Sequence, residues 1–271
     1  FDPATDSVAV EDMVAVDCWA ISEAARVQGD IQSAYADREF HRVYHTLHNY
    51  CVNDLGGLYL DLLKDRLYTL PEKSIARRSA QTALLHIAEG LVRWIAPVLS
   101  FTADEIWRLL PGDRTESLFL QGWWAFPTIG ASDISWGHLI TARDAARKVL
   151  EVERANGKIG SGLQANLALY AEGPMRSVLE ATKDEIRFWL QVSSVRVSTL
   201  GMLNNGDVPV GEPFPAEIHN ELTITAWPAT SPKCDRCWHY REDVGQHAGH
   251  ETICGRCVSN IEGPGETRRY F

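Results

Sequence analysis

The chain has 271 residues, a hydrophobic fraction of 45% and a formal net charge of −10. This length allows one large domain or two to three smaller ones, and the composition supplies enough apolar side chains for ordinary cores. The negative charge argues against a protein that coats nucleic acid non-specifically, and without a run of about 18 apolar residues no membrane span is expected. From Ala229 onward six Lys and Arg residues balance six Asp and Glu residues, so the acidic excess lies in residues 1–228.

Helical periodicity dominates residues 1–125, which we expect to form a helical bundle. A first apolar series over 13–27 predicts a helix that ends at Gly29. A second series over 40–62 predicts one buried stripe, with a kink or close packing where Gly56-Gly57 interrupts it. The members of this second stripe are Phe40, Tyr44, Leu47, Cys51, Leu55, Leu58 and Leu62.

Two more helices complete the predicted bundle. Ser74 is placed to cap the third helix, which Pro97 should end or bend. The run Thr102-Ala-Asp-Glu105 has the pattern of a capping box that opens a short helix, and Pro111 should close that helix.

Residues 126–228 predict a small α+β module of different character. A helix is expected over 134–156, and the glycine-rich run 156–162 breaks it. Beyond this break, β-branched or alternating runs predict strands, and a helix is expected between the first two. The expected strands are 166–171, 194–200 and 221–227, and the helix is 174–192.

Four of the six cysteines form two Cys-x-x-Cys pairs, Cys234/Cys237 and Cys254/Cys257, separated by sixteen residues. Each pair is a knuckle that presents two thiolates on one side of a tight turn, and two knuckles complete a closed tetrahedral shell typical of structural zinc. Iron would fit the same four thiolates. The domain that we assign to 229–271 is too short for a core of its own, so the metal would supply its folding free energy.

The uneven distribution of the cysteines favours a reducing cytoplasm over a secreted disulfide framework. Cys18 and Cys51 stand alone in helical patterns and are interpreted as small core residues. We therefore predict one structural Zn²⁺ held by Cys234, Cys237, Cys254 and Cys257.

A His-x-Gly-His run, His247 to His250, has the form of an ATP-binding signature. Such a signature needs a strand that meets a helix N-terminus in a nucleotide-binding sheet, and no such alternation surrounds this one. We interpret the run as coincidence. Its histidines could replace a cysteine as metal ligands, although four thiolates already fill the shell.

Two other patterns also favour a structural interpretation. The run Gly157–Gly162 lacks the Gly-Lys-Ser/Thr ending of a phosphate loop and passes from helix to strand, so a flexible turn is expected. The acidic pairs Asp104/Glu105 and Asp184/Glu185 lie near expected helix starts, where carboxylates complement the helix dipole rather than act as acid–base couples.

Aromatic and basic residues alternate beside the first knuckle and at the end of the sequence. Unpaired RNA bases stack on aromatic rings and RNA phosphates pair with arginine, so these residues favour an RNA contact. Trp238 could equally pack on the small core around the metal. The predicted RNA contacts are Trp238, His239, Arg241, Arg268 and Arg269.

Several long runs closely resemble the C-terminal part of bacterial isoleucyl-tRNA synthetases, which are class I aminoacyl-tRNA synthetases. The resemblance is densest in 1–120 and 233–262 and thin through 195–228. The runs that carry it are FHRVYHTLHNYCVNDLGGLYLDLLKDRLYTL, ARRSAQTALLHIAEGLVRWIAPVLSFTADEIWRLLPG and KCDRCWHYREDVGQH followed by ICGRCVSN.

The resemblance implies a helical anticodon-binding domain, a connecting module and a zinc finger that helps to hold the anticodon region. It also implies tRNA-Ile as partner, a monomeric enzyme that joins isoleucine to tRNA with ATP and Mg²⁺, and a separate editing domain. Neither catalytic signature occurs here, so this region is expected to be a non-catalytic binding part. Cys18, where the family usually shows arginine, and Gly56-Gly57 depart from the family pattern.

A different class with a similar length and a similar four-cysteine finger is the formamidopyrimidine-type DNA-repair glycosylase. That chemistry needs an N-terminal proline amine followed by glutamate, whereas this sequence starts Phe1-Asp2-Pro3. A third possibility is a zinc scaffold that binds only protein. We favour the tRNA-binding interpretation.

Overall fold

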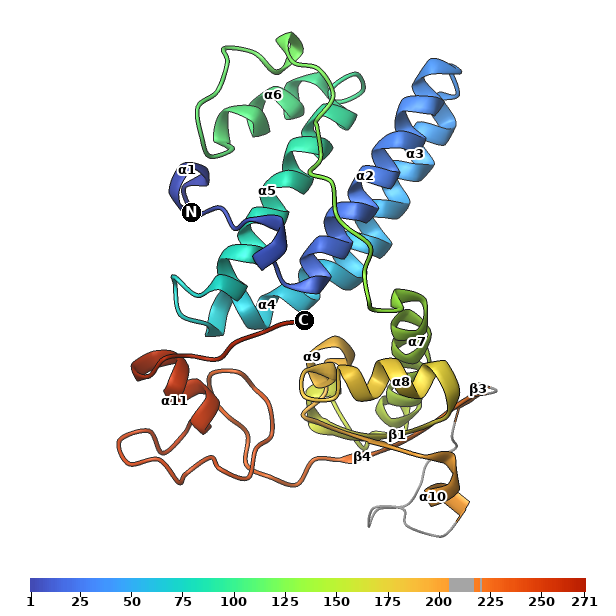
Figure 1. Cartoon of the computed structure of the whole chain (residues 1–271), viewed down its shortest axis with the longest axis vertical. Helices are drawn as coiled ribbons and strands as arrows, with labels where there is room; N and C mark the ends of the chain where they lie inside the picture. The colour runs from blue at the N-terminus through green and yellow to red at the C-terminus, as the bar shows by residue number, and fades with distance from the viewer. Residues whose placement is uncertain (205–216, 220) are drawn as a thin grey trace. The chain divides into compact units, whose positions relative to one another are not determined.

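The computed structural model describes residues 1–204, 217–219 and 221–271 (Figure 1). The chain divides into two compact units, one of residues 1–131 with 267–269 and the other of 132–266 with 270–271. Part of the expected α+β module, residues 205–216 and 220, lies outside the described residues. Among the described residues no helix combines the length and apolar character that crossing a bilayer needs. The expected division into 1–125, 126–228 and 229–271 stays a prediction.

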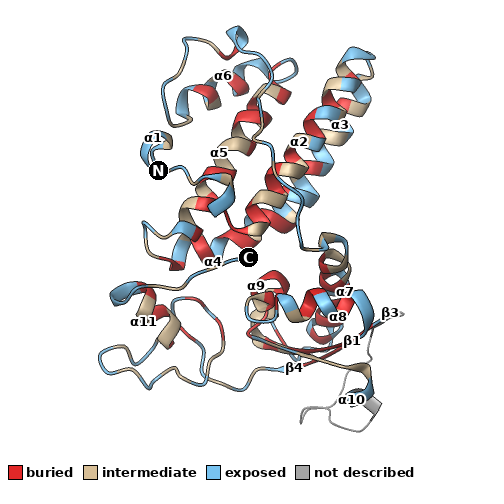
Figure 2. Cartoon of the chain, in the orientation of Figure 1, coloured by how far each residue is buried: buried red, intermediate tan, exposed pale blue. Residues whose placement is uncertain are grey.

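The first unit is built from helices, as the periodicity predicts. The long helices α2 and α5 pack against each other, and α3 packs on α2. Figure 2 shows that their buried residues face one another along the helices. The elements are α1 (Pro3–Asp6), η1 (Val10–Asp12), α2 (Ala15–Ala36), α3 (Phe40–Asn49), the π-helix η2 (Tyr50–Tyr59), α4 (Leu60–Thr69), α5 (Ile75–Ile95), α6 (Ser100–Leu109) and η3 (Leu118–Leu120).

Helix α2 continues past Gly29 to Ala36, so the predicted end at this glycine is wrong. A glycine in a helix interior costs about 1 kcal/mol, but Ile31 and Ala34 in the next turn are both fully buried. Their burial outweighs the local penalty. The other predicted boundaries of long helices are confirmed: Ser74 caps α5 by accepting from the Arg77 amide at 3.3 Å, and α5 ends before Pro97.

The predicted stripe over 40–62 is only partly correct. Phe40 and Tyr44 are 62% and 61% exposed, whereas Val43 and Tyr50 are buried. The expected disturbance at Gly56-Gly57 is confirmed, since the chain widens into a π-helix over 50–59. A Cβ on Gly56 would lie 3.1 Å from the carbonyl oxygen of Cys51, so the glycine suits this close backbone approach.

The capping box predicted at 102–105 is wrong. Helix α6 already begins at Ser100, and the flanking Leu99 makes no side-chain cap. Asp104 instead forms an ion pair with Arg108 one turn later, at 2.6 Å. The predicted close of this helix before Pro111 is confirmed, because α6 ends at Leu109.

A buried ion pair joins several helical segments of the first unit. Asp17 on α2 and Arg66 on α4 are 0% and 1% exposed, and two guanidinium nitrogens donate to the carboxylate at 2.6 and 2.7 Å. The hydroxyls of Tyr59 and Ser79 donate to the same carboxylate at 2.7 and 2.5 Å. Burial lowers the pKa of Arg66, but the charge and hydrogen bonds of Asp17 raise it by more, so the guanidinium stays protonated. At the neighbouring Cys18 the thiol lies 3.7 Å from the carbonyl oxygen of Val10.

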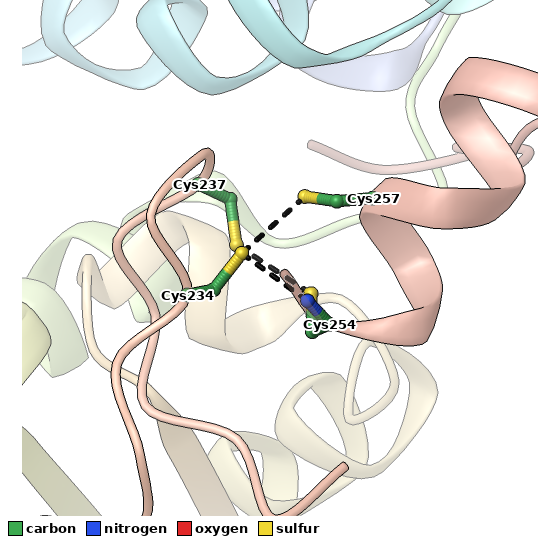
Figure 3. A group of neighbouring side chains, drawn as sticks. All are labelled: Cys234, Cys237, Cys254 and Cys257. Carbon is green, nitrogen blue, oxygen red and sulfur yellow. Dashed lines mark hydrogen bonds between the residues drawn. The ribbon is translucent and has the colours of Figure 1, made fainter. Parts of the chain in front are cut away.

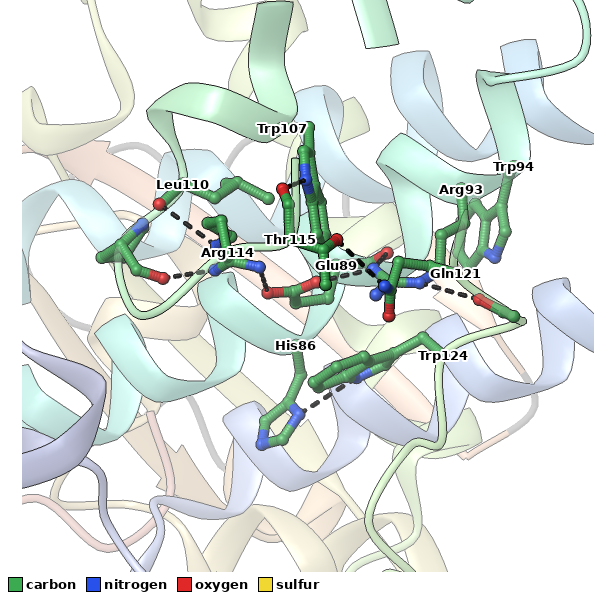
Figure 4. A network of polar contacts seen from close by, with 12 residues as sticks. His86, Glu89, Arg93, Trp94, Trp107, Leu110, Arg114, Thr115, Gln121 and Trp124 are labelled. Carbon is green, nitrogen blue, oxygen red and sulfur yellow. Dashed lines mark hydrogen bonds and ion pairs between the residues drawn. The ribbon is translucent and has the colours of Figure 1, made fainter. Parts of the chain in front are cut away.

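A second polar network fastens the segment after α6 to the bundle (Figure 4). The buried Glu89 on α5 forms ion pairs with Arg93, at 2.6 Å, and with Arg114. Both guanidinium groups lie over the ring of Trp107, at 5.0 and 4.7 Å from its centroid, and Arg93 also lies 5.0 Å from the centroid of Trp124. Such cation–π contacts hold the charges while the rings exclude water.

The second unit is an α+β module that also contains the cysteine-rich segment. Its sheet has the order β2-β1-β4-β3, with β2 parallel to β1 and β4 antiparallel to it. Trp189 is fully buried and its indole donates to the Leu139 carbonyl at 2.8 Å, which ties α9 to α7. The elements are α7 (Trp136–Ala155), η4 (Gly162–Gln164), β1 (Ala165–Ala171), α8 (Gly173–Ala181), α9 (Ile186–Leu190), β2 (Ser194–Ser198), α10 (Leu200–Asn204), β3 (Glu217–His219), β4 (Leu222–Pro228) and α11 (Gly255–Glu262).

The predicted strands are confirmed to within two residues at each end, and the predicted helix over 174–192 is divided into α8 and α9. Residues 157–161 are confirmed as an irregular turn, and Gly162 begins η4. A Cβ on Gly162 would lie 2.7 Å from the Gln191 carbonyl oxygen, so the glycine allows two backbone segments to touch. Glu185 precedes α9, and its carboxylate accepts from the backbone amides of Tyr270 and Phe271 at 2.9 and 3.0 Å. Sequence patterns alone did not indicate that contact.

Candidate metal centre and nucleic-acid interface

The four predicted cysteines converge in the structure (Figure 3). Their sulfurs all lie within 4.8 Å of one another, and all four residues are buried. Two of the sulfur pairs, Cys234 with Cys257 and Cys237 with Cys254, are 3.8 Å apart. Each of these pairs joins one knuckle to the other.

These distances fit a tetrahedral metal. Four sulfurs at about 2.3 Å from a central Zn²⁺ are separated by about 3.8 Å along each edge of the tetrahedron. The four thiolates leave no position for water, so a zinc ion here would be structural rather than catalytic. The candidate centre is therefore a closed site of four cysteines.

The local backbone explains why the sulfurs meet. In the first knuckle the amide of Trp238 donates to the Cys234 carbonyl at 2.9 Å, which closes the turn between the two cysteines. In the second, Cys254 flanks the start of α11 and Cys257 lies in its first turn. The Cys254 amide donates to the Cys234 sulfur at 3.4 Å. Amide donors and a helix N-terminus both stabilise thiolate charge.

The close approach of the sulfurs shifts the pKa values of the cysteine thiols in opposite directions. Hydrogen bonds from the Cys237 and Cys257 thiols lower the pKa of Cys254, and the same contact with Cys254 raises the pKa of Cys237 to about 12. A divalent cation would displace the thiol protons, because thiolates rather than thiols are the metal ligands.

Asp243, which sequence reasoning missed, supports the second knuckle. Its carboxylate accepts from the Gly255 amide at 2.8 Å and lies 3.4 Å from Nε2 of His247. Nε2 of His250 lies 2.9 Å from a carboxylate oxygen of Glu262. Both histidines of the His-x-Gly-His run therefore contact carboxylates and lie outside the sulfur cluster. No signal beyond its place in the loop could have singled out Asp243.

The finger is held to the α+β module by its first knuckle. The Tyr240 amide donates to the Ser193 hydroxyl at 2.7 Å, and Gln164 donates to the Tyr240 hydroxyl at 3.2 Å. His239 is 4% exposed and packs edge-on against Phe188, with ring centroids 5.6 Å apart. Of the residues after Cys237, His239 and Tyr240 thus anchor the finger, whereas Trp238 faces solvent.

Trp238 is the most exposed ring in the finger. Its side chain is 60% exposed, and Lys233 Nζ lies 5.3 Å from the ring centroid. Its backbone is in the left-handed region, with φ of 65°. Bulky residues rarely adopt this conformation, and such outliers concentrate at functional sites.

The predicted arginines differ in their surroundings. Arg241 is 37% exposed along its side chain and lies 3.9 Å from Asp243. The Arg268 side chain is 1% exposed and is bound by Asp65 at 2.7 Å. Arg269 is exposed, and its carbonyl accepts from the Ala15 amide at 3.0 Å. The side chains of Arg268 and His239 are therefore buried, and neither lies on the surface where the RNA contact is predicted.

Residues 17–169 match the family described as the anticodon-binding domain of tRNA ligase. Residues 231–260 match the zinc finger found in FPG and IleRS. The zinc-finger match by itself is compatible with either the ligase or the glycosylase interpretation. The anticodon-binding match, together with the relatives below, favours the ligase. Nothing in these likenesses favours the glycosylase.

Curated relatives extend the likeness over the whole chain. It is 45% identical over 274 residues to the isoleucine–tRNA ligase of Teredinibacter turnerae, 47% over 276 to that of Nitrosococcus oceani and 44% over 275 to that of Pseudomonas aeruginosa. Each alignment covers 100% of this chain but only 28% or 29% of the relative, so the chain spans less than a third of the proteins that it matches. With the helical first unit and the four-cysteine finger, these matches show that the chain belongs to the family of the anticodon-binding domain of tRNA ligases.

Proposed function

We propose that the chain is the anticodon-arm recognition part of an isoleucine–tRNA ligase that joins isoleucine to tRNA-Ile with ATP. The observation that carries this proposal is the identity of 44–47% to isoleucine–tRNA ligases across the full chain. ATP and Mg²⁺ would act in a catalytic domain of the same polypeptide, which would also carry the editing domain. We propose a monomer that works in the cytoplasm, where free thiols stay reduced and keep the four-cysteine site available to zinc.

In this proposal the finger presents Trp238 and Arg241 to the RNA. The indole of Trp238 is exposed and flanked by Lys233, a combination that suits an unpaired base beside a phosphate. Arg269, which is also exposed, is retained as a candidate phosphate contact. Binding energy gathered at the anticodon arm would orient the distant acceptor end for reaction.

Binding of tRNA-Ile by the zinc-loaded chain tests the proposal. We expect a mobility shift with tRNA-Ile at low salt that is weaker with a tRNA of unrelated anticodon, because phosphate contacts alone do not discriminate. Equal affinity for both RNAs, or no shift at all, would contradict it.

A substitution of Trp238 separates an RNA role from a packing role. Trp238→Gly removes the ring but suits a φ of 65°, so the finger should be at least as stable as the parent while tRNA affinity falls. Ile261→Ala, at a 47% exposed position of α11 in the same finger, is the matched control and should leave affinity unchanged. A destabilised Trp238→Gly finger with normal RNA affinity would assign Trp238 to packing.

A further inference from the structure

The loop between the two knuckles carries a carboxylate that acts on the second knuckle. Asp243 accepts a hydrogen bond from the backbone amide of Gly255 at 2.8 Å, across twelve positions of the sequence. Gly255 is the first residue of α11 and lies between the two cysteines of this knuckle. The first amides of a helix have no acceptor within the helix, so a carboxylate from another segment can cap them and complement the helix dipole.

The usual position for a capping side chain is occupied here by a predicted metal ligand. Cys254 flanks the start of α11, and its sulfur lies 3.8 Å from that of Cys237 within the cluster. The Cys254 side chain therefore faces the other sulfurs instead of the helix amides. A helix that begins at a metal ligand needs its cap from elsewhere in the chain, and Asp243 supplies it.

Gly255 permits this close contact because it has no side chain. A Cβ at this position would lie 3.0 Å from a carboxylate oxygen of Asp243 and 2.8 Å from two ring atoms of His247. Both distances are shorter than the ordinary separation of non-bonded heavy atoms, which is about 3.5–4.0 Å. The carboxylate and the imidazole thus close over the glycine and leave no room for a methyl group.

His247 holds the same carboxylate from the loop itself. Its Nε2 lies 3.4 Å from Oδ2 of Asp243, the oxygen that accepts from Gly255. The Gln246 amide donates to the Asp243 carbonyl at 3.2 Å, which closes the turn between the two side chains. The adjacent Val244 packs against the four cysteines. The loop is therefore anchored to the sulfur cluster by an apolar contact and to α11 by a carboxylate.

We propose that Asp243, held by His247, is a positioning residue for the zinc site: it keeps the first turn of α11 in the geometry in which Cys254 and Cys257 reach the metal. The inference goes beyond the proposed function, since it concerns how the finger retains its metal and not which RNA it meets. Binding of the metal and folding of the finger are coupled, so a contact that stabilises the closed finger raises metal affinity. Removal of a residue that orients metal ligands costs about 10- to 100-fold in metal affinity.

Competition with a chelator of known zinc affinity tests the proposal on the full chain. Asp243→Ala should weaken zinc binding about 10- to 100-fold, whereas Asp243→Asn should bind zinc like the parent, because its amide oxygen still accepts from Gly255. Glu242→Ala removes the same charge at the neighbouring exposed position and is the matched control. Co²⁺ gives a second measurement, since its visible absorption reports tetrahedral coordination by thiolates. Asp243→Ala should reach the spectrum of the parent, but only at a higher Co²⁺ concentration.

A double-mutant cycle with Gly255→Ala locates the effect. The added methyl group should weaken zinc binding in the parent, and it should cost less in Asp243→Ala, where the contact that it disturbs is already lost. Parental zinc affinity in Asp243→Ala, or equal losses in Asp243→Ala and Glu242→Ala, would overturn the proposal. Asp243→Asn as weak as Asp243→Ala would also overturn it, because the effect would then come from charge and not from the cap. If Asp243→Ala binds no zinc at all, recovery of binding in Asp243→Asn supports the cap, and failure to recover counts against it.

Discussion

Substitution of Asp17 by asparagine should unfold the helical unit far more readily than any change at a surface ion pair. The amide has the size of the carboxylate but no charge, so Arg66, 1% exposed, would keep its charge without a counterion. Tyr59 and Ser79 would compete for one remaining carbonyl oxygen. Breaking a buried pair by removing one partner costs about 3–5 kcal/mol.

Native-state hydrogen exchange measures this loss within one unit of a two-unit chain. Amides of α2 and α5 that exchange through opening of the unit should speed up by about 10²- to 10³-fold or more, while those of the sheet stay unchanged. Glu23→Gln, which removes a partner of the 57% exposed Arg26, is the matched control and should cost less than about 1 kcal/mol. A loss of stability in Asp17→Asn as small as in Glu23→Gln would refute the assignment of the pair as a structural centre.

Three further predictions concern glycine packing, a buried acid and the metal. Gly29→Ala should stabilise the helical unit by about 0.5–1 kcal/mol, since no neighbouring atom lies within 4 Å of the added Cβ. Gly90→Ala should destabilise the unit by about 1–3 kcal/mol, because its Cβ would lie 2.6 Å from the Phe126 ring. Thermal melting of the two variants measures both effects. Burial raises the pKa of Glu153 above 4.5, so the folded state holds this proton more tightly than the unfolded state, and the free energy of unfolding falls as the pH rises above 4.5. Glu153→Gln should therefore stabilise the chain at pH 7 and lose this advantage below pH 4.5, as measured by denaturant titrations. A stabilisation that does not change with pH would contradict this cause. Cys254→Ser, or removal of zinc by a chelator, should abolish the slow exchange of the α11 amides while those of α5 stay protected, and protection that survives metal removal would show that the finger folds without zinc.

The metal centre could be predicted from sequence because its ligands are encoded by local spacing. Each short Cys-x-x-Cys run forms its own tight turn, so the four-thiolate site requires only that the two turns come into contact. Asp17 and Arg66, in contrast, are separated by 49 positions, and nothing in either neighbourhood indicates the other. Their partnership depends on how α2 and α4 pack, which hydrophobic periodicity does not specify.

Errors in the helical unit have a common physical origin. Local preference predicts a helix end at Gly29 and a helix start at Thr102, but the buried turn after Gly29 continues α2, and α6 begins two residues before Thr102. Phe40 and Tyr44 are apolar at helical spacing, which predicts core positions, but positions 43, 47 and 50 lie on the inner face. Periodicity indicates that a helix has an apolar face, but an apolar series shifted by one residue along the sequence matches the helical period almost as well.

The run Tyr-Leu-Asp-x-x-Lys-Asp-Arg, residues 59–66, directs its first and last residues inward, whereas Leu60 and Lys64 are exposed. Tyr59 and Arg66 donate to Asp17, and Asp65 binds Arg268. Substitution of Tyr59, Asp65 or Arg66 should therefore alter how firmly the domain holds its shape. Under the proposed function, residues that distinguish one tRNA from another are to be sought among exposed positions rather than among these buried contacts.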